Sequence, residues 1–158
     1  MAAERLWAPW RLQYIRGEKD GECIFCTKPA LEDEEALIAY RGEKCFVMLN
    51  AFPYTSGHVM IAPYEHTADL AGLDEATARE LTTLTQRSLR AIGAAYSPEG
   101  FNVGANLGTV AGAGIADHVH MHVVPRWEGD TNFMPVLADV KVLPEHLAET
   151  RRKLAGEF

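Results

Sequence analysis

Three of the six histidines alternate with apolar residues in one segment of the 158-residue chain, Asp-His-Val-His-Met-His-Val-Val-Pro at 117–125. Alternate side chains of an extended strand share a face, so His118, His120 and His122 are predicted to form a row, spaced about 6–7 Å apart. A single strand histidine is usually exposed or simply hydrogen-bonded, and a His-x-His pair is most often part of a metal site. Three alternating imidazoles, with a fourth at His58, indicate a site that carries chemistry.

A glycine-rich stretch, Gly-Thr-Val-Ala-Gly-Ala-Gly at 108–114, lies just before this histidine row. Gly112, Ala113, Gly114 and Ile115 would let backbone N–H groups approach phosphate oxygens closely. An ordinary flexible hairpin is the alternative for such a stretch. Its position directly before the histidines favours a phosphate-binding loop.

Two of the three cysteines form a C-x-x-C pair, Cys23 and Cys26, whereas Cys45 stands alone in an apolar stretch. Three cysteines are too few, and of the wrong parity, for a secreted disulfide scaffold. The pair is compatible with a redox centre, with two buried thiols or with half of a metal site. The pair by itself does not decide among these interpretations.

The hydrophobic periodicity predicts the elements that must position these residues. Period-two or short apolar runs predict strands at 36–40, 45–49, 58–62, 101–105 and 118–124, with Pro63 ending the third. Three- and four-residue steps predict a long helix from Asp74, its cap, to about Tyr96, and the run 144–154 predicts a short C-terminal helix. The sum is an α+β fold with a mainly antiparallel sheet.

The length predicts one domain over residues 1–158, with an N-terminal extension at 1–21, a core at 22–127 and a C-terminal segment at 128–158. The aromatic stretch at 6–15 is expected to pack on the body or on a second subunit. A net charge of −7 argues against a polymeric nucleic acid partner but not against a small phosphorylated ligand.

No apolar run approaches the roughly 18–20 residues of a membrane helix. The first five residues, Met-Ala-Ala-Glu-Arg, lack the layout of a secretory signal. We therefore expect a cytoplasmic protein that has no membrane partner.

The segment 118–124, His-Val-His-Met-His-Val-Val, matches in full the signature of the histidine triad family, in which three histidines alternate with apolar residues. Residues 50–63 look like the family's ribose-binding loop and following strand, and residues 106–114 look like its phosphate loop. The resemblance therefore covers most of the chain from Cys23 to Trp127, and it implies a histidine triad fold.

The resemblance implies that His120 is a nucleophile that becomes covalently nucleotidylated. A neutral imidazole offers a lone pair at pH 7 without a separate base. One ring nitrogen must then hold its proton on an acceptor, and the resemblance implies a backbone carbonyl near His118. His122 would donate to a phosphate oxygen or to the departing group, and His58 would brace the row or complete this relay.

The nucleotide itself would be held by residues on either side of the row. The Asn50 amide is suited to bond both hydroxyls of a ribose, and Asn106 belongs to the phosphate loop. Phe52 and Leu49 would sandwich the base, with plain core packing as the alternative. Trp127 would line the nucleotide or phosphate site, or else act as a buried anchor after the strand.

In some members of the superfamily a C-x-x-C pair binds zinc together with two histidines. The matching positions here are Cys23, Cys26, His66 and His118. Such a closed Cys₂His₂ set implies a structural zinc, and the nucleophilic chemistry itself needs no cofactor.

Three further stretches, at 6–11, 106–109 and 122–127, look similar to bacterial diadenosine tetraphosphate phosphorylases of this family. Such an enzyme acts on an adenine dinucleotide, passes the nucleotidyl group to inorganic phosphate and is expected to be a homodimer. Related phosphorylases tend to carry a serine near 112–114, and this sequence has none. A dinucleoside polyphosphate hydrolase, a nucleoside phosphoramidate hydrolase and a non-catalytic zinc-containing nucleotide-binding module remain the alternatives.

Overall fold

The computed structural model describes residues 22–131 and 144–158, so the aromatic stretch at 6–15 lies outside the described residues. The strands are β1 (Ile38–Arg41), β2 (Cys45–Leu49), β3 (Val59–Pro63), β4 (Gly100–Gly104) and β5 (Met121–Arg126). The helices are α2 (Ile24–Thr27), η1 (Lys28–Ala30), α3 (Asp33–Ala36), α4 (Glu75–Tyr96), η2 (Thr109–Ala111) and α6 (Leu147–Ala155). No helix within the described ranges is long and apolar enough to cross a membrane.

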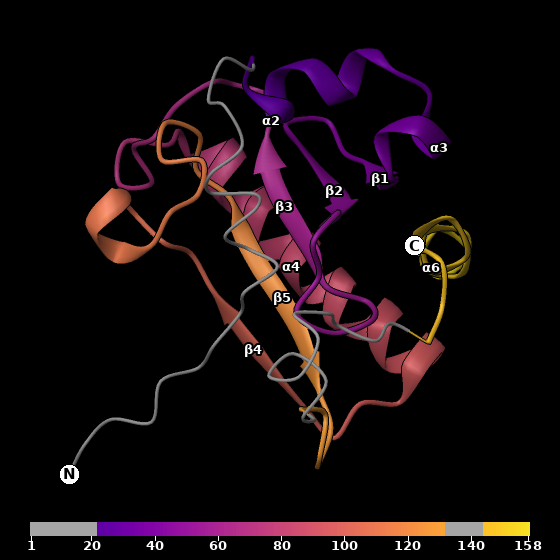
Figure 1. The fold of residues 1–158 in the computed structure, drawn as a ribbon. Helices are drawn as coiled ribbons and strands as arrows, with labels where there is room; N and C mark the ends of the chain where they lie inside the picture. Colours follow the sequence, from indigo (N-terminus) through magenta and orange to yellow (C-terminus); the bar gives the residue numbers. More distant parts are fainter. Residues whose placement is uncertain (1–21, 132–143) are drawn as a thin grey trace, which may run out of the picture.

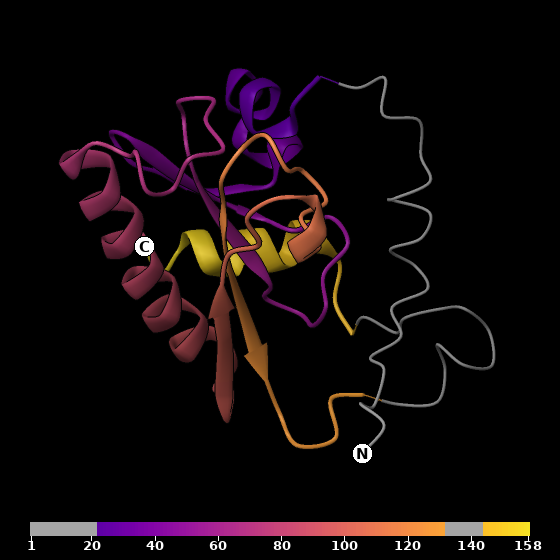
Figure 2. The same cartoon turned by 90° about the vertical axis from the view of Figure 1, so that its left-hand side faces the viewer.

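The five strands form one sheet in the order β1-β2-β3-β5-β4, and every neighbouring pair is antiparallel. Long helix α4 covers one face of this sheet, while α2 and the loop that carries η2 lie on the other side (Figures 1 and 2). The predicted α+β fold, with a mainly antiparallel sheet, one long helix and a short C-terminal helix, is confirmed.

Every residue of β2 and β3 is buried, so both faces of these central strands are covered. We call the cluster against α4 the helix-side core; its buried members are Ala39, Cys45, Val47, Leu49, Val59, Ile61, Leu81, Leu84, Ile92, Val123 and Leu154. We call the opposite cluster the site-side core; its buried members are Phe25, Ala36, Ile38, Phe46, Met48, Met60 and Ala62. The strict alternation along β2 and β3 assigns neighbouring residues to opposite cores.

Helix α4 begins as the sequence predicts. The Asp74 carboxylate accepts hydrogen bonds from the backbone N–H groups of Ala76 and Thr77, which would otherwise lack partners at the helix start. These bonds, and one from the Thr77 hydroxyl, lower the pKa of Asp74. The helix ends at Tyr96, where Ser97 adopts a left-handed conformation with φ of 46°.

Two strand boundaries differ from the sequence prediction. Ala36 was expected to start a strand, but it ends helix α3, whose first turn holds acidic residues that stabilise a helix N-terminus. Leu37 then turns the chain with a left-handed φ of 60°, and β1 begins at Ile38.

The second difference concerns the histidine row, because β5 begins only at Met121. His118 and His120 were expected in this strand, but they precede it. The register would place Val119 opposite Pro63, which has no N–H to donate to a ladder. The Val119 N–H instead donates to the carbonyl of Thr67, at 2.7 Å.

Candidate active site

The row of histidines still presents its rings on one side of the chain. The His120 and His122 rings are 4.9 Å apart between centroids. Phe25, from α2, lies against both His118 and His120, with ring centroids 5.1 and 4.6 Å away. His118 and His120 are buried, so the protein replaces much of the water around these rings with fixed contacts.

Backbone carbonyls set the protonation of the first two rings. A carbonyl oxygen only accepts hydrogen bonds, so the ring nitrogen that faces it must carry the proton. The carbonyl of Pro63 lies 2.8 Å from Nε2 of His118, which leaves the lone pair of that ring on Nδ1. The carbonyl of His118 lies 2.8 Å from Nδ1 of His120, which leaves the lone pair of that ring on Nε2. The neighbouring rings are therefore opposite tautomers.

His58 and His122 form a second, differently ordered pair. The backbone N–H of Tyr54 donates to Nδ1 of fully buried His58, at 3.1 Å. The proton of neutral His58 is therefore on Nε2, which lies 2.9 Å from Nδ1 of His122. His122 accepts there and, as a neutral ring, presents its own N–H on Nε2.

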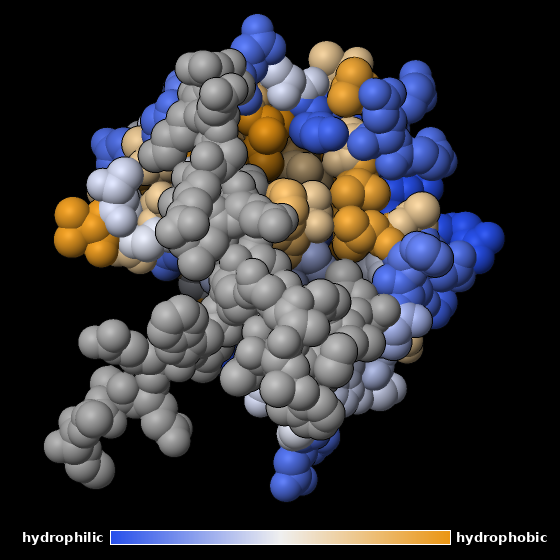
Figure 3. All heavy atoms as spheres, viewed as in Figure 1, coloured by the Kyte–Doolittle hydropathy of each residue, from blue (hydrophilic) through white to orange (hydrophobic). Residues whose placement is uncertain are grey.

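A cavity lies in front of His120 and His122. Its lining residues are Ile24, Lys28, Ala36, Leu37, Met48, Asn50, Ala51, Phe52, Met60, Asn106, Gly112, Gly114, Ile115, His120 and His122. Four of these residues, Ile24, Ala36, Met48 and Met60, belong to or pack against the site-side core, and we call the part of the cavity that they line its apolar end. The lining also includes two imidazoles and residues of the glycine-rich loop. Figure 3 shows apolar side chains gathered over the α2, β1 and β2 side of the molecule and bordered by hydrophilic ones.

Asn50 is buried, and its side-chain oxygen accepts the backbone N–H of Phe52, at 2.9 Å. This bond orients the amide and leaves its two N–H donors for another group. Phe52 itself is 41% exposed at the cavity. Leu49, in contrast, belongs to the helix-side core, because its side chain alternates with those of Met48 and Asn50.

The glycine-rich loop folds as a short helical turn, η2, between Gly108 and Gly112, whose φ angles are 84° and 88°. These left-handed values favour glycine. The N–H groups of Gly112 and Ala113 donate to carbonyls inside the loop, and the Asn106 amide donates to the Gly112 carbonyl at 3.4 Å. Gly112 and Gly114 line the cavity, whereas Ala113 does not.

Trp127 follows the last residue of β5, at the opposite end of that strand from His120, and it is half-buried. Its backbone N–H and carbonyl both bond to Asp130. Trp127 is not among the described residues that line the cavity.

Cys23, Cys26, His66 and His118 converge on one point, with their ligand atoms all within 4.8 Å of one another. The Sγ atoms of Cys23 and Cys26 lie 3.3 and 3.6 Å from Nδ1 of His118, and Nδ1 of His66 lies 3.2 Å from that same nitrogen. A tetrahedral zinc ion requires about 3.3 Å between two nitrogen ligands and about 3.6 Å between nitrogen and sulfur. The cluster therefore has the dimensions of a closed zinc site.

The surroundings of this cluster suit a metal ligand set. Burial lowers the pKa of His118, more than its bond to Pro63 raises it, and so favours the neutral ring. Asp117 lies 3.7 Å from Nε2 of His66, on the side of that ring away from the cluster. In contrast, burial, followed by the hydrogen bond to Cys23, raises the pKa of Cys26, so a metal ion must displace the proton of this thiol to bind.

Several lining residues were not predicted from the sequence. Met48 was recoverable, because it alternates with Asn50 along one strand. Ile24 and Lys28 lie one helical turn apart, but a four-residue helix gives too little periodicity to reveal its inner face. Phe25, which contacts His118 and His120 but is not among the lining residues, gave no signal either, since an aromatic residue in an apolar stretch is usually ordinary core.

A family model described as HIT domain matches residues 32–129. An AP-4-A phosphorylase of Mycobacterium tuberculosis is 41% identical over 164 residues, covering 98% of this chain and 84% of that protein. An adenosine 5'-monophosphoramidase of Schizosaccharomyces pombe is 31% identical over 104 residues, covering 66% of this chain and 74% of that protein.

Two solved structures share the fold. A hypothetical histidine triad nucleotide-binding protein of Sulfolobus tokodaii superposes with a TM-score of 0.68 at 26% identity, over 85% of this chain and 91% of that chain. A Zn-bound histidine triad family protein of Mycobacterium smegmatis superposes with a TM-score of 0.66 at 26% identity, over 86% of this chain and 92% of that chain. With the family model and the full-length relative, these matches establish that the chain belongs to the HIT family.

Proposed function

We propose that the chain is a dinucleoside polyphosphate phosphorylase that cleaves diadenosine tetraphosphate through a covalent nucleotidyl-His120 intermediate and transfers the nucleotidyl group to inorganic phosphate. The observation that carries the proposal is the bond from His120 Nδ1 to the His118 carbonyl, because it holds the Nε2 lone pair at the cavity. The 41% identical phosphorylase supports the substrate class.

In the first step, Nε2 of His120 attacks the α-phosphorus, an N–P bond forms and the P–O bond to the leaving ATP breaks. No proton has to move, since ATP departs as an anion and the imidazolium that forms keeps its Nδ1 proton on the His118 carbonyl. His122 donates Nε2–H to the phosphate or leaving oxygen, and His58 fixes that tautomer.

In the second step, an oxygen of inorganic phosphate attacks the same phosphorus, the N–P bond breaks, and ADP and neutral His120 are released. Hydrogen phosphate already carries a nucleophilic oxygen, whereas attack by water requires a base to take a proton. We assign the amides of Gly114 and Ile115 to the phosphate, because those of Gly112 and Ala113 bond within the loop.

The base occupies the apolar end of the cavity, between Phe52 on one side and Ile24 and Met48 on the other. The two N–H donors of Asn50 face the ribose hydroxyls. With Leu49 in the helix-side core, these residues replace the sandwich predicted from the sequence.

We propose that Cys23, Cys26, His66 and His118 hold a structural zinc ion. The distances among these ligand atoms and the Zn-bound relative of known structure support it. Such an ion contributes folding free energy by tying α2 to the histidine row, and no step of the reaction passes through it.

We also propose that residues 1–158 are one domain and that the protein is a homodimer. Strand β4 supports the dimer, because it lies at an edge of the sheet and its last three residues, 102–104, are exposed. Sedimentation of the full chain tests this part: a species of one chain mass at micromolar concentration contradicts it.

Product analysis of diadenosine tetraphosphate turnover, with and without inorganic phosphate, tests the activity. ADP plus ATP, dependent on phosphate, supports phosphorolysis, whereas AMP plus ATP identifies a hydrolase and contradicts the proposed acceptor. The Schizosaccharomyces pombe relative motivates a parallel assay on adenosine 5'-monophosphoramidate. Faster turnover there assigns a phosphoramidate hydrolase, and silence on both substrates with tight nucleotide binding assigns a non-catalytic module.

A further inference from the structure

Among the described residues that line the cavity, Lys28 is the only lysine or arginine, and none is an aspartate or glutamate. Its side chain is half-buried. No ion pair involves Lys28 within residues 22–131 and 144–158. A lysine stem can pack on apolar surface while its ammonium keeps its donors for a ligand, and no carboxylate of the described residues takes them here.

The helix geometry directs Lys28 toward the cavity. Lys28 caps α2 with helical dihedral angles, and its backbone N–H donates to the carbonyl of Ile24. Residues four apart share one helix face, and Ile24 also lines the cavity.

Lys28 borders the apolar end of the cavity. It begins η1, which packs against α3, and α3 supplies the lining residue Ala36. Ile24 and Ala36 pack with the site-side core. The end that Lys28 borders is therefore the one that receives the base.

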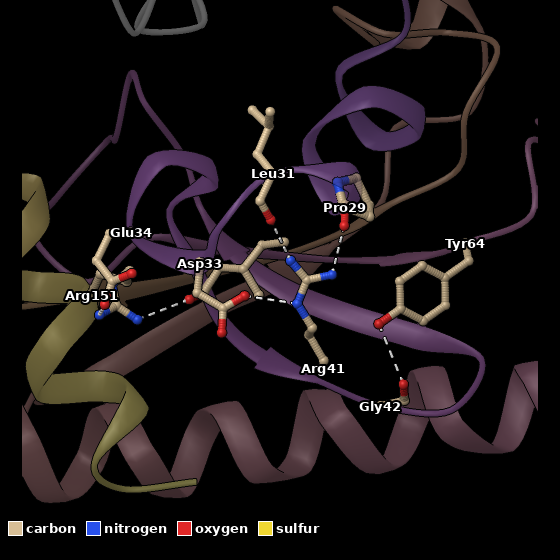
Figure 4. Close-up of polar contacts among 9 residues, drawn as sticks. Pro29, Leu31, Asp33, Glu34, Arg41, Gly42, Tyr64 and Arg151 are labelled. Atoms are coloured by element: carbon tan, nitrogen blue, oxygen red, sulfur yellow. Dashed lines mark hydrogen bonds and ion pairs between the residues drawn. The ribbon is translucent and has the colours of Figure 1, made fainter.

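Arg41 fixes the residues that follow Lys28 in the sequence, and Figure 4 shows its contacts with Pro29, Leu31 and Asp33. The Arg41 guanidinium donates to the carbonyls of Pro29 and Leu31 at 2.7 and 2.9 Å, and to the Asp33 carboxylate at 2.7 Å. These three bonds hold the turn that follows Lys28. They also engage Asp33 with Arg41 and not with Lys28.

We propose that the Lys28 ammonium donates a hydrogen bond to a ring nitrogen on the edge of the purine, which makes Lys28 a specificity-determining residue of the cavity. This inference rests on the proposed function, because it takes the base to occupy the apolar end. An ammonium has three donors and no acceptor, and adenine offers acceptors at N1, N3 and N7.

The test is a cycle between protein and ligand variants, measured as equilibrium binding by calorimetry on the full chain. The proteins are the wild type, Lys28→Met, which keeps the aliphatic stem, Lys28→Arg, which keeps the charge, and Lys44→Met, which removes an exposed surface charge. The ligands are AMP, its 1-deaza, 3-deaza and 7-deaza analogues, and inorganic phosphate.

We expect Lys28→Met to bind AMP about 10-fold to 100-fold more weakly than the wild type, since one hydrogen bond to a charged donor is lost. One deaza analogue should bind the wild type more weakly than AMP does, by the same factor. The same analogue and AMP should bind Lys28→Met equally. Lys28→Arg should retain most of the AMP affinity, and Lys44→Met should match the wild type.

Equal AMP affinity of the wild type and Lys28→Met overturns the inference. So does an equal loss on all four nucleotides, which places the ammonium on ribose or phosphate. Thermal unfolding of each variant, with Lys28→Gln as a second substitution, separates a lost contact from a lost fold. Failure of the wild type to bind any of the nucleotides contradicts the proposed function itself.

Discussion

The histidine row divides into two halves that use the same residue type for different chemistry. At His118 the carbonyl of Pro63 holds Nε2–H, and the Nδ1 lone pair joins Cys23, Cys26 and His66. At His120, two residues on, the carbonyl of His118 holds Nδ1–H, and the Nε2 lone pair faces the cavity. The backbone acceptor that each ring meets decides which nitrogen is available and therefore what the residue can do.

The two halves are joined through His118, which supplies a ligand nitrogen to one and a carbonyl to the other. Phe25, which lies between Cys23 and Cys26 in the sequence, packs against both His118 and His120. Variants that disrupt only one half test whether turnover and zinc binding depend on each other.

The largest effect is expected from His120→Ala. Removing the proposed nucleophile should lower diadenosine tetraphosphate turnover by about 10⁴-fold. Zinc content should stay at the wild-type level, because His120 is not among the cluster ligands. Steady-state kinetics and metal analysis of the same sample check both statements. Residual turnover within tenfold of the wild type contradicts the assignment of His120 as the nucleophile.

Cys23→Ser should produce the reverse pattern. Loss of one of four ligands should weaken zinc binding by about 100-fold or more, measured by competition with a chelator. Cys45→Ser is the matched control, since Cys45 is buried in the helix-side core and burial raises its pKa to about 12, so it stays a thiol. Equal zinc affinity of Cys23→Ser and Cys45→Ser refutes the metal half.

His58→Leu should lower kcat by about 10-fold to 100-fold and leave KM nearly unchanged, because it removes the donor that orients His122. His58→Gln should recover part of this loss, since an amide can accept from the Tyr54 N–H and donate onward. A change in KM alone in both variants argues instead for a purely structural role.

The smallest effect is expected for Glu80, which lies outside both halves and contributes to the stability of the fold. The Glu80 carboxylate accepts backbone N–H groups of Glu43, Lys44 and Cys45. Burial raises its pKa, but these bonds outweigh burial and hold the pKa below its ordinary value. The stabilising contribution of Glu80 is therefore complete above the unfolded pKa and is lost as the pH falls through the lower folded pKa.

Glu80→Gln should accordingly reduce stability at pH 7 by about 1–2 kcal/mol, and the difference from the wild type should shrink below pH 4. Urea unfolding across pH measures it, with Glu65→Gln, at an exposed position outside the helices and strands, as the control. A constant difference at every pH contradicts the role of the Glu80 charge.

The sequence was sufficient to predict the sheet and the long helix, because alternating and helical periodicities are local signals. The set of Cys23, Cys26, His66 and His118 came from the resemblance to the histidine triad family and not from periodicity. The sequence prediction placed His118 and His120 inside β5, although pairing there is interrupted opposite Pro63, a residue distant in sequence. The tautomers were not predictable for the same reason, since they depend on carbonyls that only the folded chain brings to each ring.

Leu49 shows a different limit. Its neighbour Asn50 was identified by its chemistry, but a leucine fits a base pocket and a core equally well in the sequence. Only the register of β2 with β3 assigns Leu49 to the helix-side core and Met48 to the cavity.

The most direct test of the division between the two halves is the chemical identity of the covalent adduct. Rapid quenching in alkali after mixing with diadenosine tetraphosphate, without inorganic phosphate, should trap an adenylyl group on His120. Peptide mass spectrometry and NMR of the labelled imidazole should place the phosphorus on Nε2, because Nδ1 is held by the His118 carbonyl. An adduct on His118 or His122, or on Nδ1 of His120, would contradict the account.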